Sequence, residues 1–186
     1  SVTTTSDGAD AVSVFAEEGF ADLRNHGTIT TGYIEEDVYH YGDGSIAAYA
    51  FGEEGALALN TGTITTFGDE GAHALYAATN TDTAQALNTG TITTSGDNSH
   101  GVLANAFGDE VYIGYDDYLE APIYDVVGGY AIAGNAGSVQ TSGENSYGVA
   151  ALSKYGDAAA YNIFGGSIVT SGESAHGLVA ATGVEI

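Results

Sequence analysis

The residues of this sequence that could do chemistry are mostly carboxylates, and one set of them recurs directly after a glycine. Asp69, Asp97 and Glu144 hold this position in successive copies of a repeated pattern. Carboxylate oxygens are ligands that Ca²⁺ prefers, and a divalent cation would relieve repulsion along a row of like charges. The sequence has no EF-hand loop and no Gly-Gly-x-Gly-x-Asp nonapeptide, which favours a solvated acidic edge. A calcium site at these three residues is the alternative, and no other cofactor is expected.

Enzymatic chemistry has little support in the sequence. Adjacent carboxylates such as Glu53 and Glu54 would point to opposite faces of a strand, so they cannot work as a pair. Arg24 and Lys154 are the two cations of the chain, and they are far apart in the repeats. Polysaccharide lyases and hydrolases need paired carboxylates or a positive group that stabilises developing charge. We therefore predict that the protein is not an enzyme.

Three histidines recur at one position of the repeat. They are His73, His100 and His176, and Tyr147 occupies the same position in another copy. A row of imidazoles could bind a transition metal, but histidine ligands are normally oriented by a carboxylate partner. We interpret this position as part of the surface of the repeat.

The charge of the chain excludes several kinds of partner. The 186 residues include 25 acidic and two basic side chains, which gives a net charge of −23. Such a chain repels nucleic acids and anionic membrane surfaces, and no stretch is apolar enough for a membrane-spanning helix. There is no cysteine, and the sequence opens without a methionine or an apolar leader. We expect a mature secreted product, located outside the cell or on its surface.

The sequence is built from a repeat that opens with the motif Asn-x-Gly-[Thr/Ser]-[Ile/Val]-x-Thr. Copies begin at Asn25, Asn60, Asn88 and Asn135, and a fifth copy, at Asn162, carries two extra residues. Each unit holds three short segments of alternating polarity bounded by Gly, Asn and Asp, which is typical of strands. Three strands per unit predict an all-β, three-sided parallel β-solenoid of about six coils. We expect one domain over residues 1–186, with insertions near 32–41 and 108–130.

The alternation within each strand assigns side chains to the interior or the surface. One aliphatic position of the first strand should form an inward column in which each member lies about 4.8 Å from the next. The members of this column are Ile29, Ile64, Ile92, Val139 and Ile168. The third strand should turn its alanines inward, so this side of the prism is predicted to be thin. The outward Thr28-x-Thr30, Thr63-x-Thr65 and Thr91-x-Thr93 pairs resemble those of ice-binding solenoids, although threonine is also a common outward strand residue.

The recurrent asparagines share the inward parity at a corner of the coil. They are Asn25, Asn60, Asn88, Asn135 and Asn162. An amide side chain at this place can bond the backbone of its own turn and the equivalent amides above and below. We predict an asparagine ladder. The alternative is that asparagine simply tolerates the left-handed conformation next to glycine.

The repeat resembles those of autotransporter passenger domains and other secreted bacterial β-helix adhesins. The pattern that carries the resemblance is Ile-x-Thr-x-Gly-[Asp/Glu]-x-[Ser/Ala]-x-Gly-[Val/Leu]-x-Ala, which covers nearly the whole chain except the two insertions. The resemblance implies a right-handed parallel β-helix at the cell surface. The resemblance says little about the function of the protein, because the shared residues are those that build the coils. The chain lacks the translocator segment of such proteins, so it is either a processed fragment or a stand-alone subunit.

The end coils suggest self-assembly. No capping helix is predicted at either end, and open coil faces tend to polymerise unless they are covered. We predict that copies stack end to end as a filament or surface fibre, an interaction that does not close on itself. Artificial ends of a fragment are the alternative explanation.

The second insertion is rich in tyrosine and acidic residues. Its tyrosines are Tyr112, Tyr115, Tyr118, Tyr124 and Tyr130. Aromatic rings beside carboxylates bind sugars or calcium and also form polar-rimmed protein contacts. We favour a role as a cover for the apolar outer side of the third strands or as a subunit contact. Binding of a surface glycan is the alternative.

Overall fold

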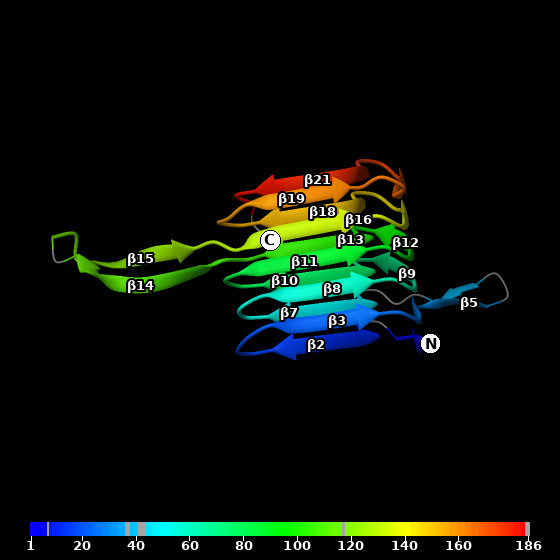
Figure 1. The fold of residues 1–186 in the computed structure, drawn as a ribbon, viewed down its shortest axis with the longest axis horizontal. Helices are drawn as coiled ribbons and strands as arrows, with labels where there is room; N and C mark the ends of the chain where they lie inside the picture. The colour runs from blue at the N-terminus through cyan, green and yellow to red at the C-terminus, as the bar shows by residue number, and fades with distance from the viewer. Residues whose placement is uncertain (7, 36–37, 41–43, 117, 185–186) are drawn as a thin grey trace.

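The computed structural model describes residues 1–6, 8–35, 38–40, 44–116 and 118–184, and the regular elements of this part of the chain are strands. They form three parallel sheets that wrap around one axis, with each coil stacked on the one before (Figure 1). The predicted three-sided parallel β-solenoid is therefore confirmed. Within the described ranges, no helix is both long and apolar enough to pass through a bilayer.

Each sheet collects the equivalent strand of successive coils. Sheet A contains β1 (Val2–Thr4), β4 (Thr28–Thr31), β9 (Thr63–Glu70), β12 (Thr91–Asp97), β17 (Ser138–Ser142) and β20 (Ser167–Ser171). Sheet B contains β2 (Val12–Ala16), β7 (Ala48–Gly52), β10 (Leu75–Thr79), β13 (Val102–Ala106), β18 (Tyr147–Ser153) and β21 (His176–Thr182). Sheet C contains β3 (Ala21–Asn25), β8 (Ala56–Asn60), β11 (Thr83–Asn88), β16 (Tyr130–Asn135) and β19 (Ala158–Asn162).

The parallel register places like residues above one another, which explains why the motif repeats. Ile64 pairs with Ile92, and Ile92 pairs with Val139. All three side chains are fully buried. A parallel ladder aligns equivalent residues of successive coils, so each inward position forms a continuous apolar column.

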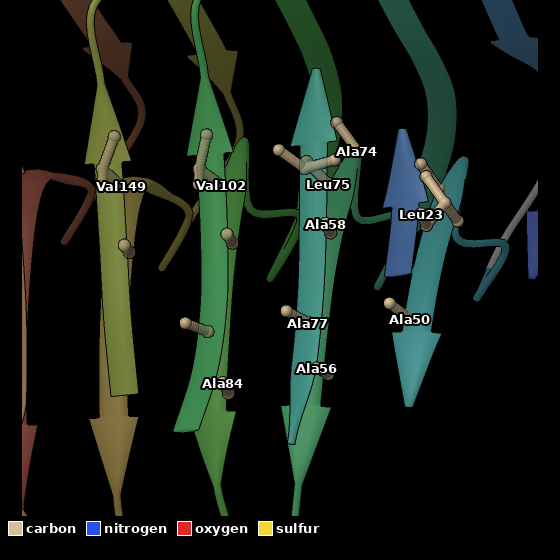
Figure 2. Close-up of a cluster of buried hydrophobic side chains, with 14 of the residues drawn as sticks. Leu23, Ala50, Ala56, Ala58, Ala74, Leu75, Ala77, Ala84, Val102 and Val149 are labelled. Atoms are coloured by element: carbon tan, nitrogen blue, oxygen red, sulfur yellow. The ribbon is translucent and has the colours of Figure 1, made fainter. Parts of the chain in front are cut away.

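The interior is asymmetric because sheet C contributes almost only methyl groups. Ala56, Ala58 and Ala84 are fully buried and face larger side chains of sheet B such as Leu75 and Val102 (Figure 2). Small residues on one side allow the sheets to approach closely while large residues on another fill the space. The prism therefore has one thin side, as the alanine pattern predicted.

The glycines that open each repeat are required by close stacking at the corner after sheet C. A β-carbon on Gly90 would collide with the backbone oxygen of Gly62, and one on Gly137 would collide with that of Gly90. Neither obstacle is the end of a flexible side chain, so the backbone itself would have to move. This corner tolerates glycine alone, which accounts for the glycine in the motif.

The two insertions form antiparallel hairpins. The first contains β5 (Tyr33–Glu35) and β6 (Val38–His40), and residues 36–37 and 41 of this insertion lie outside the described part. The second contains β14 (Asp109–Asp116) and β15 (Ala121–Val127), here called the arm. The arm projects away from the solenoid (Figure 1). The expectation that it covers sheet C is therefore wrong, because the two strands pair only with each other and extend outward.

Candidate interaction surfaces

The asparagines form a continuous hydrogen-bonded row along one corner. The Nδ2 group of Asn60 donates to Oδ1 of Asn88 at 2.8 Å, and Asn88 donates to Asn135 at the same distance. Asn25 begins this row and Asn162 receives its last bond. Each of the inner amides also binds the glycine of its own turn, as Asn88 binds the N–H and C=O of Gly90. The row has a direction, because every Nδ2 points toward the next coil.

The acidic edge is less regular than the sequence suggested. Asp97 pairs with Glu70 and not with Asp69, because β9 holds one extra residue at this point. The Asp97 carboxylate accepts a hydrogen bond from the backbone N–H of Glu144 at 2.7 Å, so it serves the turn of the neighbouring coil. The side chain of Asp69 lies outside the described part. Among the side chains that are described, no three His, Cys, Asp or Glu residues come together as a metal site.

A row of stacked rings runs along the outside of sheet B, and the sequence analysis missed most of it. His73 stacks on His100 with ring centroids 4.8 Å apart, and His100 stacks on Tyr147 at 4.6 Å. Tyr76 meets the edge of His73 and stacks on Tyr49 at 4.9 Å. Phe15 and Phe51 extend the row toward the first coil, and His176 extends it toward the last. The histidines are thus part of an aromatic column, and His73 and His100 are half-buried in it.

The two inner histidines of the column also bond the backbone. Nδ1 of His73 accepts the backbone N–H of His100, and Nδ1 of His100 accepts that of Tyr147, both at 3.1 Å. An acceptor nitrogen must be unprotonated, so each ring is neutral with its proton on Nε2. Burial lowers the pKa of His73 to about 4 and that of His100 to about 3, and the neighbouring His73 contributes to the second shift.

These two histidines should make the coil stack sensitive to acid. Their folded pKa values lie below the unfolded value of about 6.5, so protonation favours the unfolded chain. Their contribution to stability is complete above about pH 6.5 and falls as the pH drops toward 4. The double variant His73→Asn, His100→Asn keeps an acceptor near each Nδ1 position but does not titrate. We expect its urea midpoint to fall less than that of the wild type between pH 7 and pH 4.5.

The exposed His26 provides the matched control for this experiment. The Asp and Glu residues are the same in the wild type and in every variant, so the difference between proteins isolates the imidazoles. His26→Asn should retain the full acid sensitivity of the wild type. Equal pH dependence in the wild type and the double variant would contradict the role assigned to the column.

The structure separates the tyrosines of the second insertion into two groups. Tyr112, Tyr115 and Tyr124 lie on the strands of the arm, and Tyr118 lies at its tip with 93% of its surface exposed. Tyr130 begins β16 in sheet C, where it pairs with Thr83. The five tyrosines therefore do not form one site, and only the first four belong to the arm.

The outward threonines of sheet A align in two columns. Thr28, Thr63 and Thr91 are in register, as are the residues two places further along each strand. The second column continues into Gln140 and Val169 in the last two coils. The regular array is thus limited to the middle of the face.

The stacked parallel coils, the alanine-lined side and the asparagine row define this protein as a three-sided parallel β-solenoid. A family model, that of the BigA third pectate lyase-like domain, matches residues 1–114. The chain belongs to this family. No curated protein and no solved structure matches it.

Proposed function

We propose that the protein is an extracellular structural and adhesive β-solenoid whose coils stack end to end as a rod or filament, without catalysis. The observation that carries the proposal is the exposure of inward positions in the end coils. Leu178 occupies the same column as the fully buried Val149, yet 47% of its surface is exposed. At the other end, Val2 of the isoleucine column is 39% exposed. Each end thus presents apolar surface that another coil would bury.

The first coil is hollow at its open end. A hollow of about 120 Å³ at the first coil is lined by Val2, Val12, Leu23 and Ile29 among others. These residues would be covered by a coil stacked beneath them, as the equivalent residues of inner coils are. Leu178 is exposed in the last coil, at the opposite end, so a head-to-tail contact would place apolar surface against this hollow. This favours head-to-tail stacking, which grows without closing.

The asparagine row gives the two ends of the coil stack different hydrogen-bonding groups. Each Nδ2 donates to the Oδ1 of the following coil, so the first coil offers the Oδ1 of Asn25 and the last offers the Nδ2 of Asn162. In the described chain sheet C holds one strand fewer than sheets A and B, so a copy stacked on β20 and β21 would leave one sheet C position between Asn162 and Asn25. The donor end of one row would then face the acceptor end of the next across that position. Head-to-head contact would bring two acceptors together, which is unfavourable.

The surroundings of the two cations support a role without catalysis. Arg24 is exposed and forms an ion pair with Asp22 on the outside of sheet C. Lys154 lies over the ring of Tyr155. Both cations are engaged in separate local contacts, so a shared positive site for developing charge is not formed.

The name of the family describes the coil architecture. The extracellular location proposed here rests on that architecture and on the acidic surface.

The proposal is tested by placing a charge in the end contact. Leu178→Glu should prevent stacking, because a carboxylate cannot be buried against the hollow of the next copy. Val169→Glu changes the charge equally but lies on the outer face of β20, so it should leave assembly intact. Sedimentation velocity over a range of concentrations and negative-stain microscopy measure the outcome. A wild-type chain that stays monomeric at every concentration and forms no rods would contradict the proposal.

A further inference from the structure

The arm gathers most of its aromatic surface on one face. Cross-strand partners share a face of a two-stranded sheet, and Tyr112 pairs with Tyr124 while Tyr115 pairs with Pro122. The register shifts between Tyr112 and Gly114, which inserts one extra residue into β14. Without this bulge Tyr112 and Tyr115 would point to opposite sides, because side chains alternate along a strand. The bulge thus places three tyrosines together.

This face, here called the tyrosine face, has no cover within the described chain. Its members are Tyr112, Tyr115, Pro122, Tyr124 and Val126. The three tyrosines are 52–57% exposed, and the rings of Tyr112 and Tyr124 meet edge to face at 5.9 Å. A two-stranded hairpin is marginally stable alone in water, and an exposed apolar patch commonly marks a contact surface. Tyrosine loses little conformational entropy when it is buried, which suits it to binding.

The charge of the arm indicates what kind of partner the tyrosine face can accept. Residues 109–127 contain no lysine or arginine. The described acidic residues of this segment are Asp109, Glu110, Asp116, Glu120 and Asp125. The arm of a second copy would bring the same acidic residues, without a lysine or arginine, against this arm and would be repelled by it. Charge complementarity therefore favours a cationic partner.

The foot of the arm already shows the chemistry that such a partner would use. The Nζ atom of Lys154 lies 4.6 Å from the centroid of the Tyr155 ring. The hydroxyl of Tyr155 donates to Oε1 of Glu110 at 2.8 Å, which connects the ring to the acidic arm. A tyrosine ring beside a carboxylate thus holds a cation in this protein. The tyrosine face offers three further rings, with Glu110 on the same side and no lysine or arginine in residues 109–127. Asp109, Asp116 and Asp125 lie on the opposite side and add to the negative charge of the arm.

We propose that the tyrosine face of the arm binds a cationic, extended polypeptide segment of another protein. Arginine and lysine side chains of the partner lie over the tyrosine rings, and the net negative charge of the arm attracts them. The partner's apolar residues cover Pro122 and Val126. The arm thereby acts as a contact element held away from the rod, independently of how the rod ends stack.

The probe is a fluorescent nine-residue peptide of alternating arginine and valine, measured by anisotropy in 0.15 M NaCl. The wild type should bind it, and the double variant Tyr112→Ser, Tyr124→Ser should bind about tenfold more weakly. Tyr112→Phe, Tyr124→Phe keeps the ring faces and should bind within about twofold of the wild type. The matched control Val111→Ser, Ile123→Ser removes exposed apolar groups from the opposite face and should also retain binding.

Three outcomes would overturn the proposal. Equal binding by the wild type and the serine variant of the tyrosines would show general attraction to an acidic protein. Binding of cellohexaose that is lost in the same variant, without peptide binding, would assign the face to a glycan. Arm-dependent dimers in sedimentation would assign it to a second copy. Far-ultraviolet circular dichroism and the melting temperature verify that each variant is folded.

Discussion

Ile92→Asp should unfold the middle of the solenoid. Ile92 is fully buried between Ile64 and Val139 in the column that continues through sheet A. A carboxylate at this place would be surrounded by aliphatic side chains and would leave a charge without a partner. We expect a loss of unfolding free energy on the order of 4–5 kcal/mol, which is at the upper end of single-residue effects. Urea unfolding monitored by circular dichroism measures this loss.

The neighbouring residue gives the control for Ile92→Asp. Thr91 is exposed on the outer face of the same strand, so Thr91→Asp adds the same charge without burying it. We expect a change of no more than about 0.5 kcal/mol. Because unfolding of adjacent coils is coupled, the effect of Ile92→Asp should also reach the exchange of backbone amides in β9 and β17. Wild-type stability in Ile92→Asp would refute the assignment of interior and surface.

The columns of the solenoid could be predicted because each coil contributes the same residue type at the same place. Isoleucine and asparagine recur at fixed positions of the repeat in the sequence, and parallel stacking of the coils places these recurring residues in contact. The aromatic column escaped this reasoning. Its rings come from three positions of the repeat, represented by Phe15, Tyr76 and His73, and each position is aromatic in only some of the coils. The row passes from one position to the next, so no single repeated residue reveals it.

The course of the arm was not predictable from the sequence either. An insertion of mixed tyrosine and acidic residues can fold back over an apolar face or extend from it, and composition does not decide between them. In the structure the insertion extends outward as the arm. Among the described side chains, Glu110 of the arm is hydrogen-bonded to Tyr155 of the coils at the foot of the arm. The local register of β9 was similarly hidden, because one extra residue moved Glu70 into the place expected for Asp69.

Asn88→Asp should break the asparagine row while keeping the shape of the side chain. Asn88 is buried, and its Nδ2 group donates to Oδ1 of Asn135 and to the carbonyl of Gly90. A carboxylate cannot donate, so an oxygen would face the oxygen of Asn135 at the distance of a hydrogen bond. We expect a loss on the order of 3–5 kcal/mol at pH 7, because the new charge is buried without a counter-ion. Thermal unfolding and urea titration measure it.

The pH dependence of this variant separates a directional row from a merely tolerated turn residue. Burial beside an acceptor raises the folded pKa of the introduced carboxyl above its unfolded value of about 3.9. The protonated form can again donate, so the deficit relative to the wild type should shrink as the pH falls through that raised pKa. Asn162→Asp at the exposed end of the row loses only a bond to the backbone of Gly166 and should cost about 1 kcal/mol or less. If Asn88→Asp and Asn162→Asp destabilise equally and without a difference in pH dependence, the amide contacts between coils contribute nothing, and asparagine is present only for its backbone conformation.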